Sequence, residues 1–419
     1  MSGAIRNLNI AMVAACPFPT SQGSQVLIRE LSEALSRRGH RVHVVTYHFG
    51  EPLECPGLII HRIPELFRYN KFRSGPEIRK PILDLLLMRK LDQVVRREGI
   101  DIVHAHNYEA PLAALPVCRR HRIPLVYHSH NTMSDEFYTY FRLKIPQKLA
   151  RAAARFMDRY IPRQADFIIA INPQVAAFLT GMGTPATKIK YIPPGIDYGE
   201  VPRPDPAILK KCGIRDEKLI LYAGNLDGYQ RIDLLLEALA QVFKAHEDAR
   251  FVLMTGSDTT GFVRDVERLA LSDRITVVPG PSYERVKALL AHGRVAVNSR
   301  ISWSGFPIKL LNYMAAGLPV VAFRGAAAPV VDGQTGILAP PGNIKAFAAA
   351  INVLLSDQDL SRRLGSEAKR MAMEQFTWKV IAGGVERIYH RLLGIRLLDS
   401  LPEVSRNKGR ELPKFEYSA

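Results

Sequence analysis

The stretch Ser302-Trp-Ser-Gly-Phe-Pro-Ile-Lys-Leu-Leu-Asn-Tyr-Met-Ala-Ala-Gly-Leu-Pro-Val-Val321 decides how this chain folds. A Gly-Phe-Pro turn opens a helical pattern over 307–316, with Pro307 in the first turn, where its missing N–H costs nothing. Gly317 is a typical helix stop, and Pro319 opens an apolar run. The stretch therefore predicts a helix that leads into a buried strand, as in a parallel strand–helix–strand unit.

The same alternation of apolar runs and helical patterns extends outward from this stretch. Runs that are apolar on both faces predict buried strands, and apolar residues three and four apart predict helices. The predicted strands cover 10–15, 42–46, 100–104, 124–128, 167–171, 218–223, 250–255, 275–278, 295–298 and 319–323. The predicted helices cover 26–39, 77–98, 110–121, 146–164, 173–181, 232–243, 282–291, 307–316, 344–355, 358–374 and 378–393. This order predicts parallel β-α-β units with helices on both sides of each sheet.

The length of 419 residues predicts more than one domain. A proline-rich stretch over 192–206 suits a hinge, so we expect an N-terminal domain over 1–199 and a second domain over 200–377. The polar segment 396–419 is expected to be a flexible tail. Two doubly wound domains that face each other would leave a cleft at the carboxyl ends of their strands, where ligands bind in such sheets.

Composition excludes several classes of protein. The chain is 47% hydrophobic and 23% charged, which is typical of globular proteins and not of disordered or fibrous ones. No apolar run reaches the ~18–20 residues of a membrane span, and the N-terminus lacks a secretory pattern. The four cysteines lie far apart without metal-finger spacing, which favours reduced thiols. These features predict a soluble, cytoplasmic protein.

The net charge of +17 is less ordinary, and +11 of it falls within residues 1–199. Such a field attracts phosphate groups. The segment 68–97 holds nine basic and three acidic residues around an apolar run. Its helix either lies on an anionic membrane surface or packs its apolar stripe against its own domain. No helix-turn-helix, zinc or RNA-binding aromatic signature accompanies the charge, so nucleic acid is not an expected partner.

The stretch around Pro307 also predicts an anion site. Free N–H groups and the positive end of the helix dipole meet at such a helix start. Lys309 and Asn312 are three residues apart, so we expect them to share a helix face and to reach one ligand. A plain packing unit is the alternative, but the lysine beside a glycine-opened helix start favours a phosphate site.

At this point the sequence resembles a known family. The stretch is similar to the signature of family 4 glycosyltransferases of the GT-B fold, written E-G-F-x-x-x-x-x-E-A-M-A-x-G-x-P-V-V. Further similar segments are Pro17–Gln25 with Gly39-His40, Asp101–His106, Val126–Asn131, Tyr191–Asp197, Tyr222–Leu226, Asp332–Leu338 and Phe376–Trp378. The resemblance implies two Rossmann-like, doubly wound parallel-sheet domains facing across a cleft. It assigns the acceptor to the first domain and the nucleotide sugar to the second, and it has the last helix, 378–393, cross back to the first domain.

The resemblance also implies retaining transfer of a sugar from a nucleotide donor, without a metal or another cofactor. The leaving diphosphate must then be neutralised by basic side chains and backbone amides. The implied donor-binding residues are Gly23, Gly224, Asn225, Gln230, Arg231, Arg300, Gly305, Phe306, Lys309 and Asn312. His130 is the implied catalytic residue beside the reacting sugar, although a lone histidine is more often structural. Gln25, Glu109 and Asn131 are implied acceptor residues, and for Glu109 a charge that stabilises a helix N-terminus is an equally good explanation.

Four positions depart from the family pattern. Ser304 and Asn312 stand where the family has two glutamates, and Asn225 and Gln230 stand where it has arginine and lysine. A neutral Asn312 amide can still hold ribose hydroxyls, at a loss of about 1 kcal/mol. The positive charge lost at the leaving group has Arg231, Arg300 and Lys309 as its candidate replacements. This pattern is typical of a variant branch of the family.

Two functional hypotheses follow. In the first, the chain transfers a sugar to a glycan, glycolipid or lipid-linked acceptor, and works in the cytoplasm in peripheral contact with an anionic membrane. In the second, it is a catalytically inactive, glycosyltransferase-like binding or regulatory subunit, because four polar positions are replaced.

Overall fold

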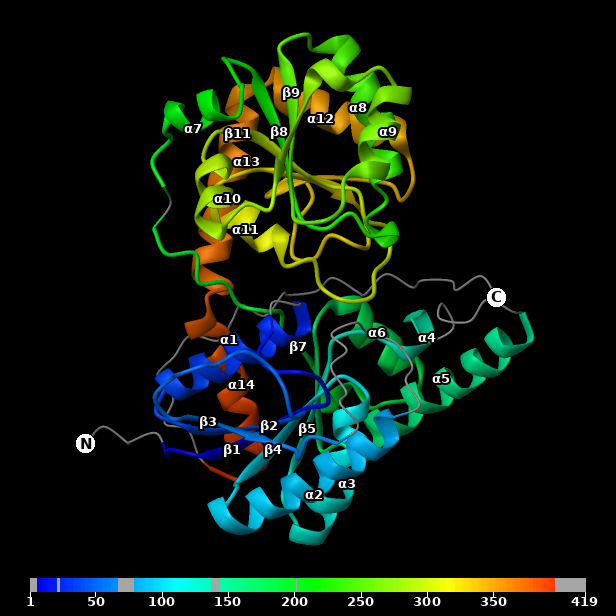
Figure 1. Ribbon diagram of the computed structural model, residues 1–419, viewed down its shortest axis with the longest axis vertical. Coiled ribbons are helices and arrows are strands. Elements are labelled where there is room, and N and C mark those ends of the chain that lie inside the picture. The colour runs from blue at the N-terminus through cyan, green and yellow to red at the C-terminus, as the bar shows by residue number, and fades with distance from the viewer. Residues whose placement is uncertain (1–5, 21–22, 67–78, 137–143, 201, 396–419) are drawn as a thin grey trace. The chain divides into compact units, whose positions relative to one another are not determined.

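The computed structural model describes residues 6–20, 23–66, 79–136, 144–200 and 202–395. The expected tail, 396–419, lies outside these residues. The chain divides into two compact units (Figure 1). The first unit runs to Gly195 and includes the last helix, which begins at Trp378. The second unit is Ile196–Thr377.

The first unit is built on a parallel seven-stranded sheet with the strand order β3-β2-β1-β4-β5-β6-β7. Its strands are β1 (Asn9–Ala14), β2 (Arg41–Thr46), β3 (Leu58–Arg62), β4 (Ile102–His106), β5 (Leu125–Ser129), β6 (Phe167–Ala170) and β7 (Ile189–Tyr191). Its helices are α1 (Gly23–Arg37), α2 (Lys80–Glu98), α3 (Glu109–His121), α4 (Met133–Glu136), α5 (Lys144–Gln164), α6 (Pro173–Gly181), η2 (Ala186–Lys188) and α14 (Trp378–Leu392).

The second unit repeats the design with a parallel six-stranded sheet in the order β10-β9-β8-β11-β12-β13. Its strands are β8 (Lys218–Ala223), β9 (Ala249–Thr255), β10 (Ile275–Pro279), β11 (Gly293–Asn298), β12 (Val320–Phe323) and β13 (Gly336–Ala339). Its helices are α7 (Pro206–Lys211), η3 (Gly228–Gln230), α8 (Ile232–Ala245), α9 (Thr260–Arg268), η4 (Ser272–Arg274), α10 (Tyr283–Leu290), α11 (Lys309–Ala315), α12 (Ile344–Ser356) and α13 (Gln358–Gln375).

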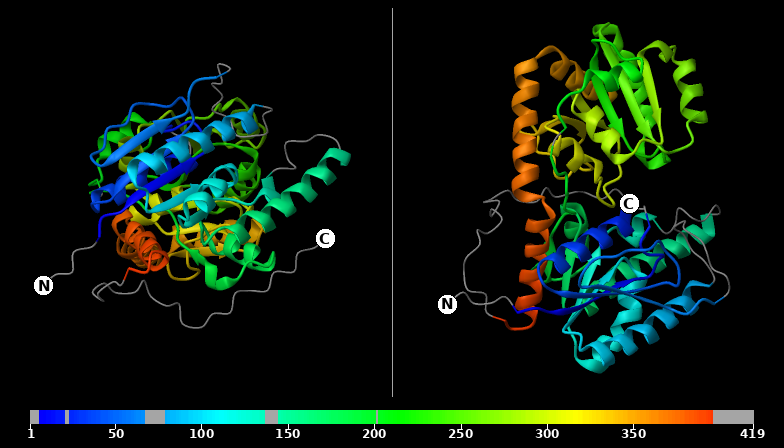
Figure 2. Two further views of the ribbon diagram at one scale, coloured as in Figure 1. Left: turned by 90° about the horizontal axis from the view of Figure 1, so that it is seen from below. Right: turned by 60° about the vertical axis from the view of Figure 1, so that its left-hand side comes forward.

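Both sheets are doubly wound. The chain order reverses between β1 and β4 in the first sheet and between β8 and β11 in the second. Figures 1 and 2 show helices on both faces of each sheet, which explains why β4 is buried along its whole length and β1 and β8 along most of theirs. In such sheets ligands bind where the order reverses, outside the carboxyl ends of the strands. The topology therefore singles out one edge of each sheet.

The predicted parallel, doubly wound architecture is confirmed, and the predicted strands coincide with strands of the two sheets. The sequence analysis missed β3, β7 and β13, which are short or lie at an outer edge of a sheet. In β3 only Leu58 is buried and the other residues are half-buried, so the continuous apolar signal of a central strand is weak there. Helix α11 begins at Lys309 and not at Pro307, because the preceding turn is closed by tighter bonds such as Leu310 N–H to Pro307 O.

The last helix, α14, packs against the first unit. The Trp378 indole donates to the Glu30 carboxylate over 2.8 Å, and the Tyr389 hydroxyl lies 2.5 Å from Nδ1 of His104 on β4. The buried Glu386 carboxylate accepts hydrogen bonds from Arg38 and, over 2.9 Å, from His40. These long-range bonds join the two ends of the described chain within one unit.

Helix α2 covers most of the basic segment 68–97, of which residues 68–78 lie outside the described part. Its apolar residues Leu83, Leu87 and Leu91 are fully buried, so the stripe packs against its own unit. Ile82 and Leu85 remain exposed in the first turns. Among the described helices, none is long and apolar enough to cross a membrane.

Candidate functional site

The predicted donor residues of the second unit gather where its sheet reverses order. Gly224 and Asn225 follow β8, Arg300 follows the neighbouring β11, and Lys309 begins α11. The apolar strands β8 and β11 end just before these polar residues. Because the two strands are parallel, their carboxyl ends lie at the same edge of the sheet. A Cβ built on Gly224 would lie 3.3 Å from the Lys309 Nζ, which shows how closely the two residues approach.

The Lys309 ammonium is held by neutral groups. Its Nζ donates to the Tyr222 hydroxyl over 2.7 Å and to the Gln230 side-chain oxygen over 2.8 Å, and it lies 4.0 Å from the centre of the Tyr222 ring. The Gln230 amide also donates to the Asn225 side-chain oxygen over 2.8 Å. Lys309 forms no ion pair within the described residues. Its positive charge is positioned by hydrogen bonds but is not neutralised.

Burial and the nearby Arg300 guanidinium lower the pKa of Lys309 well below that of an ordinary lysine. Arg300 is itself buried, lies over the Tyr229 ring at 5.2 Å and donates from Nε to the Ser302 carbonyl over 2.7 Å. Two cations in one enclosed place disfavour each other's charged form. An incoming polyanion such as a diphosphate would relieve this repulsion and stabilise the ammonium.

The loop before α11 lines the same region. Gly305 has a φ of +80°, a left-handed conformation that a side chain would strain, and Phe306 and Ser304 are buried. The loop 299–308 contains no aspartate or glutamate, so it adds no negative charge beside Lys309.

Two predicted donor residues have other partners. The Arg231 guanidinium forms a bidentate ion pair with Asp233, with a shortest distance of 2.7 Å, at the exposed start of α8. The Asn312 side-chain oxygen accepts from the Tyr283 hydroxyl on α10 over 2.9 Å. Lys309 and Asn312 both lie on α11, and the expectation that they reach one ligand together stays a prediction.

In the first unit, the predicted catalytic residue His130 lies just past β5 and is almost completely buried. Burial lowers its pKa to about 3, so the imidazole is neutral at ordinary pH. Its Nε2 lies 3.0 Å from Nδ1 of His106 on β4, and its own Nδ1 has no hydrogen-bond partner within the described part. A buried polar atom without a partner at the carboxyl edge of the sheet is a candidate contact for a ligand.

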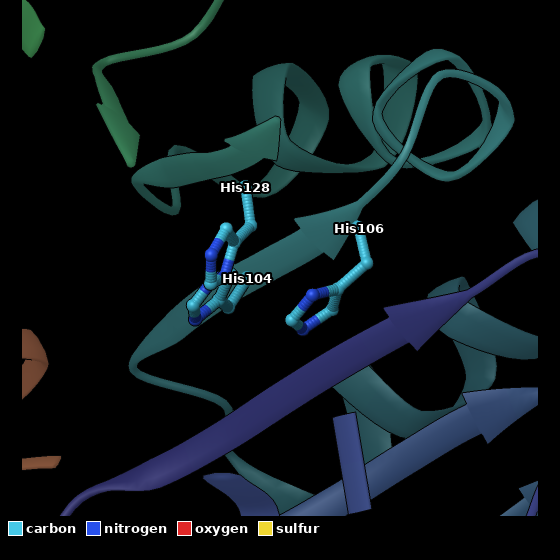
Figure 3. A group of neighbouring side chains, drawn as sticks. All are labelled: His104, His106 and His128. Carbon is cyan, nitrogen blue, oxygen red and sulfur yellow. The ribbon is translucent and has the colours of Figure 1, made fainter. Parts of the chain in front are cut away.

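His130 belongs to a cluster of imidazoles that also includes His104, His106 and His128. Figure 3 shows the last three side chains projecting to one side of β4 and β5, and their nitrogens lie within 4.8 Å of one another, close enough to hold a metal ion. Two of these rings also contact each other, since Nε2 of His104 lies 3.2 Å from Nδ1 of His128, whereas Nε2 of His106 and Nε2 of His128 have no hydrogen-bond partner within the described part. Burial lowers the pKa of all four. The cluster contains no carboxylate, which favours a neutral hydrogen-bonded array that orients His130.

The predicted acceptor residues share the carboxyl edge of this sheet. Glu109 is the first residue of α3 and forms an ion pair with Lys80 over 2.8 Å, so it faces both the helix N-terminus and a neighbouring side chain. The backbone carbonyl of the half-buried Asn131 accepts a hydrogen bond from the Ser129 hydroxyl over 3.0 Å. Gln25 is buried in α1, and Gly23 begins that helix, with no atom within 4 Å of a Cβ built there.

Sequence reasoning missed several residues at these sites. In the second unit, Tyr222 and Tyr283 hold Lys309 and Asn312. In the first unit, the Tyr47 hydroxyl donates to Asp84 over 2.8 Å, and burial raises the pKa of Asp84 to about 6. Asp84 stands alone inside the apolar run of α2, and a buried carboxyl group requires a partner. This aspartate was the signal in the sequence from which the Tyr47–Asp84 pair could have been found.

Comparisons with known proteins show the family and the fold. The family models for glycosyltransferase family 4 and for glycosyl transferases group 1 match residues 21–200 and 205–371. N-acetyl-alpha-D-glucosaminyl L-malate synthase of Bacillus anthracis is 26% identical over 389 residues, which are 90% of this chain and 96% of that protein.

Two solved structures share the fold. Sucrose-phosphate synthase of Thermosynechococcus elongatus aligns with a TM-score of 0.77 at 21% identity, over 93% of this chain and all of that one. Anabaena HepE in complex with UDP-glucose aligns with a TM-score of 0.69 at 18% identity, over 92% of this chain and all of that one. The chain therefore belongs to the family 4 glycosyltransferases, enzymes of the GT-B fold that transfer a sugar from a nucleotide-sugar donor.

Proposed function

We propose that the protein transfers the sugar with retention of anomeric configuration and without a metal, and that the second unit binds the donor. The observation that carries this proposal is the partly buried Lys309 ammonium, which has only neutral hydrogen-bond partners beside Gly224. A donor diphosphate supplies the missing negative charge. Lys309 and Arg300 then replace the arginine and lysine that the family has at Asn225 and Gln230.

This assignment makes the chain an active member of a variant branch. The family's lysine at position 230 would be a second ammonium beside Lys309. Here Gln230 instead accepts a hydrogen bond from Lys309, so one cation is supported where two would repel each other. Backbone N–H groups of Gly305 and Phe306 complete the cradle for the diphosphate within the second unit. Asn312, through its neutral amide, is the proposed ribose contact.

His130 is the proposed contact to the donor sugar. Its neutral imidazole offers the unpartnered Nδ1 to a sugar hydroxyl, while His106 fixes the ring through Nε2. The acceptor would bind along the same edge through Gln25, Glu109 and Asn131. The resemblance to the family and the basic first unit support a glycan or lipid-linked acceptor at an anionic membrane.

A thermal-shift screen tests the donor assignment. Purified protein is heated with UDP-, GDP-, ADP- and dTDP-sugars, because a ligand that binds the folded state raises its melting temperature. UDP-glucose is the first donor to try, since HepE was solved with it. We expect a rise with one nucleobase, lost in Lys309→Met. No rise with any donor contradicts the proposal.

Release of free nucleotide separates an enzyme from an inactive binding subunit. We expect slow donor hydrolysis by the wild type and roughly 100-fold slower hydrolysis by His130→Ala, with donor binding kept in both. Binding without hydrolysis or transfer in the wild type would favour the inactive subunit.

A further inference from the structure

Helix α5 of the first unit carries an apolar stripe on its outer side. Leu149 and Phe156 are 69% and 63% exposed, the two largest values among the exposed large hydrophobic side chains that the structure describes. Ala152 and Ala153 are exposed between them, and Tyr160 continues the line, its ring stacked on Phe156 at 5.7 Å. These residues are three or four apart, so they form one continuous face of the helix.

A row of basic side chains borders this stripe. Lys148, Arg151, Arg155 and Arg159 are all exposed and recur at the same spacing, which places them side by side along the helix. The only acidic residue of α5 is Asp158, which is buried. The outer side of α5 therefore carries an apolar stripe and, beside it, a row of positive charges, and no acidic residue lies between them.

The opposite side of α5 fastens the helix to its unit. Ala150 and Ala154 are buried, and the Asp158 carboxylate accepts from the backbone N–H groups of Met133 and Ser134 in α4 over 2.9 and 2.8 Å. Figures 1 and 2 show α5 reaching outward from the first unit. The exposed stripe is thus a second apolar face on a helix whose first apolar face already packs.

We propose that the outer side of α5, defined by Leu149, Phe156 and the basic row from Lys148 to Arg159, docks on an anionic lipid surface. A helix with one apolar and one basic line lies in the membrane interface, with its apolar side chains below the headgroups and its cations beside the phosphates. Charge argues against a second copy as the occupant, since its α5 would bring the same basic row against this one. The proposal does not depend on the assignment of the donor site.

The test is cosedimentation of the full chain with vesicles of phosphatidylcholine alone or with 30 mol% phosphatidylglycerol. We expect binding to the anionic vesicles only, weakening as salt rises. Leu149→Ser/Phe156→Ser should reduce binding at least about 10-fold through loss of buried apolar surface. Arg155→Gln/Arg159→Gln should reduce it about 30-fold and flatten the salt dependence.

The matched control is Ile82→Ser/Leu85→Ser on α2, where two exposed apolar side chains lie in the basic segment singled out from the sequence. This variant should bind vesicles within about twofold of the wild type. Unchanged circular dichroism and melting temperature show that every variant is folded. Three results would each overturn the proposal. The α5 variants bind vesicles as well as the wild type, or vesicle binding is lost in the α2 variant alone. In the third result the protein binds no vesicles and forms a dimer that α5 substitutions abolish.

Discussion

Replacing Lys309 by methionine tests the central electrostatic argument. The substitution keeps the length of the side chain and removes the charge between Tyr222 and Gln230. A charged hydrogen bond to a buried anion contributes about 1.5–3 kcal/mol. The dissociation constant for the nucleoside diphosphate should therefore rise about 10- to 150-fold.

The same structure predicts that this variant does not lose stability. Burial lowers the pKa of Lys309, and each unit of lowering represents about 1.4 kcal/mol by which folding disfavours the charged form of this side chain. Methionine removes that cost and leaves Tyr222 bonded to the Asn225 carbonyl over 2.8 Å. The melting temperature should equal or exceed that of the wild type.

The assay is calorimetric titration with the nucleoside diphosphate that the donor screen identifies, together with thermal unfolding without ligand. Lys218→Met is the matched control, because Lys218 begins β8 at the far end from Tyr222 and pairs with Asp248 over 2.9 Å. The control should bind within about twofold of the wild type. Unchanged affinity in a folded Lys309→Met protein would refute the placement of the diphosphate, and a large loss of stability would refute the electrostatic argument.

Three further outcomes follow from the described contacts. Donor binding should raise the lowered pKa of Lys309, so formation of the complex takes up protons. The affinity for the donor should therefore fall as pH rises through that lowered pKa. Calorimetric titrations in two buffers of different ionisation enthalpy measure the proton uptake. In His130→Ala the rate of donor hydrolysis should fall roughly 100-fold with nucleotide affinity unchanged, as steady-state kinetics would show. Burial alone would raise the pKa of Glu386, but hydrogen bonds from His40 and Arg38 leave it below its ordinary 4.5. The stability that this group contributes is therefore present above pH 4.5 and is lost as pH falls through the lowered pKa. Glu386→Gln should reduce the free energy of unfolding by roughly 3 kcal/mol at pH 7. In urea unfolding measured at several pH values, the variant should lose less stability at acid pH than the wild type.

Local pattern was sufficient for the architecture. The apolar runs that form β1, β4, β8 and β11 are continuous because both faces of each strand are covered, and that signal is visible in any short window. Edge strand β3 lacked the signal because only Leu58 of its residues is buried. Predicted helices needed only shifts at their ends, since caps and tight turns decide where a helix starts.

The candidate site was less predictable from the sequence. The glycine-opened helix start marked Gly305 and Lys309 as an anion site, and the resemblance to the family added Gly224. The side chains that bond these residues could not be predicted from the sequence. Tyr222 meets Lys309 from 87 positions away, and the equally basic Arg231 turns to its near neighbour Asp233.

The amino-acid sequence by itself determined the parallel doubly wound sheets and the edge at which we expect ligands to bind, since both depend on residue order and periodicity. Only the tertiary structure decided which cation stays without a counter-ion and which imidazole nitrogen stays unbonded. It also decided which apolar stripe faces water, because Leu83 of α2 is buried whereas Phe156 of α5 is exposed. Burial and pairing depend on neighbours brought together from distant parts of the chain, and no local pattern encodes them.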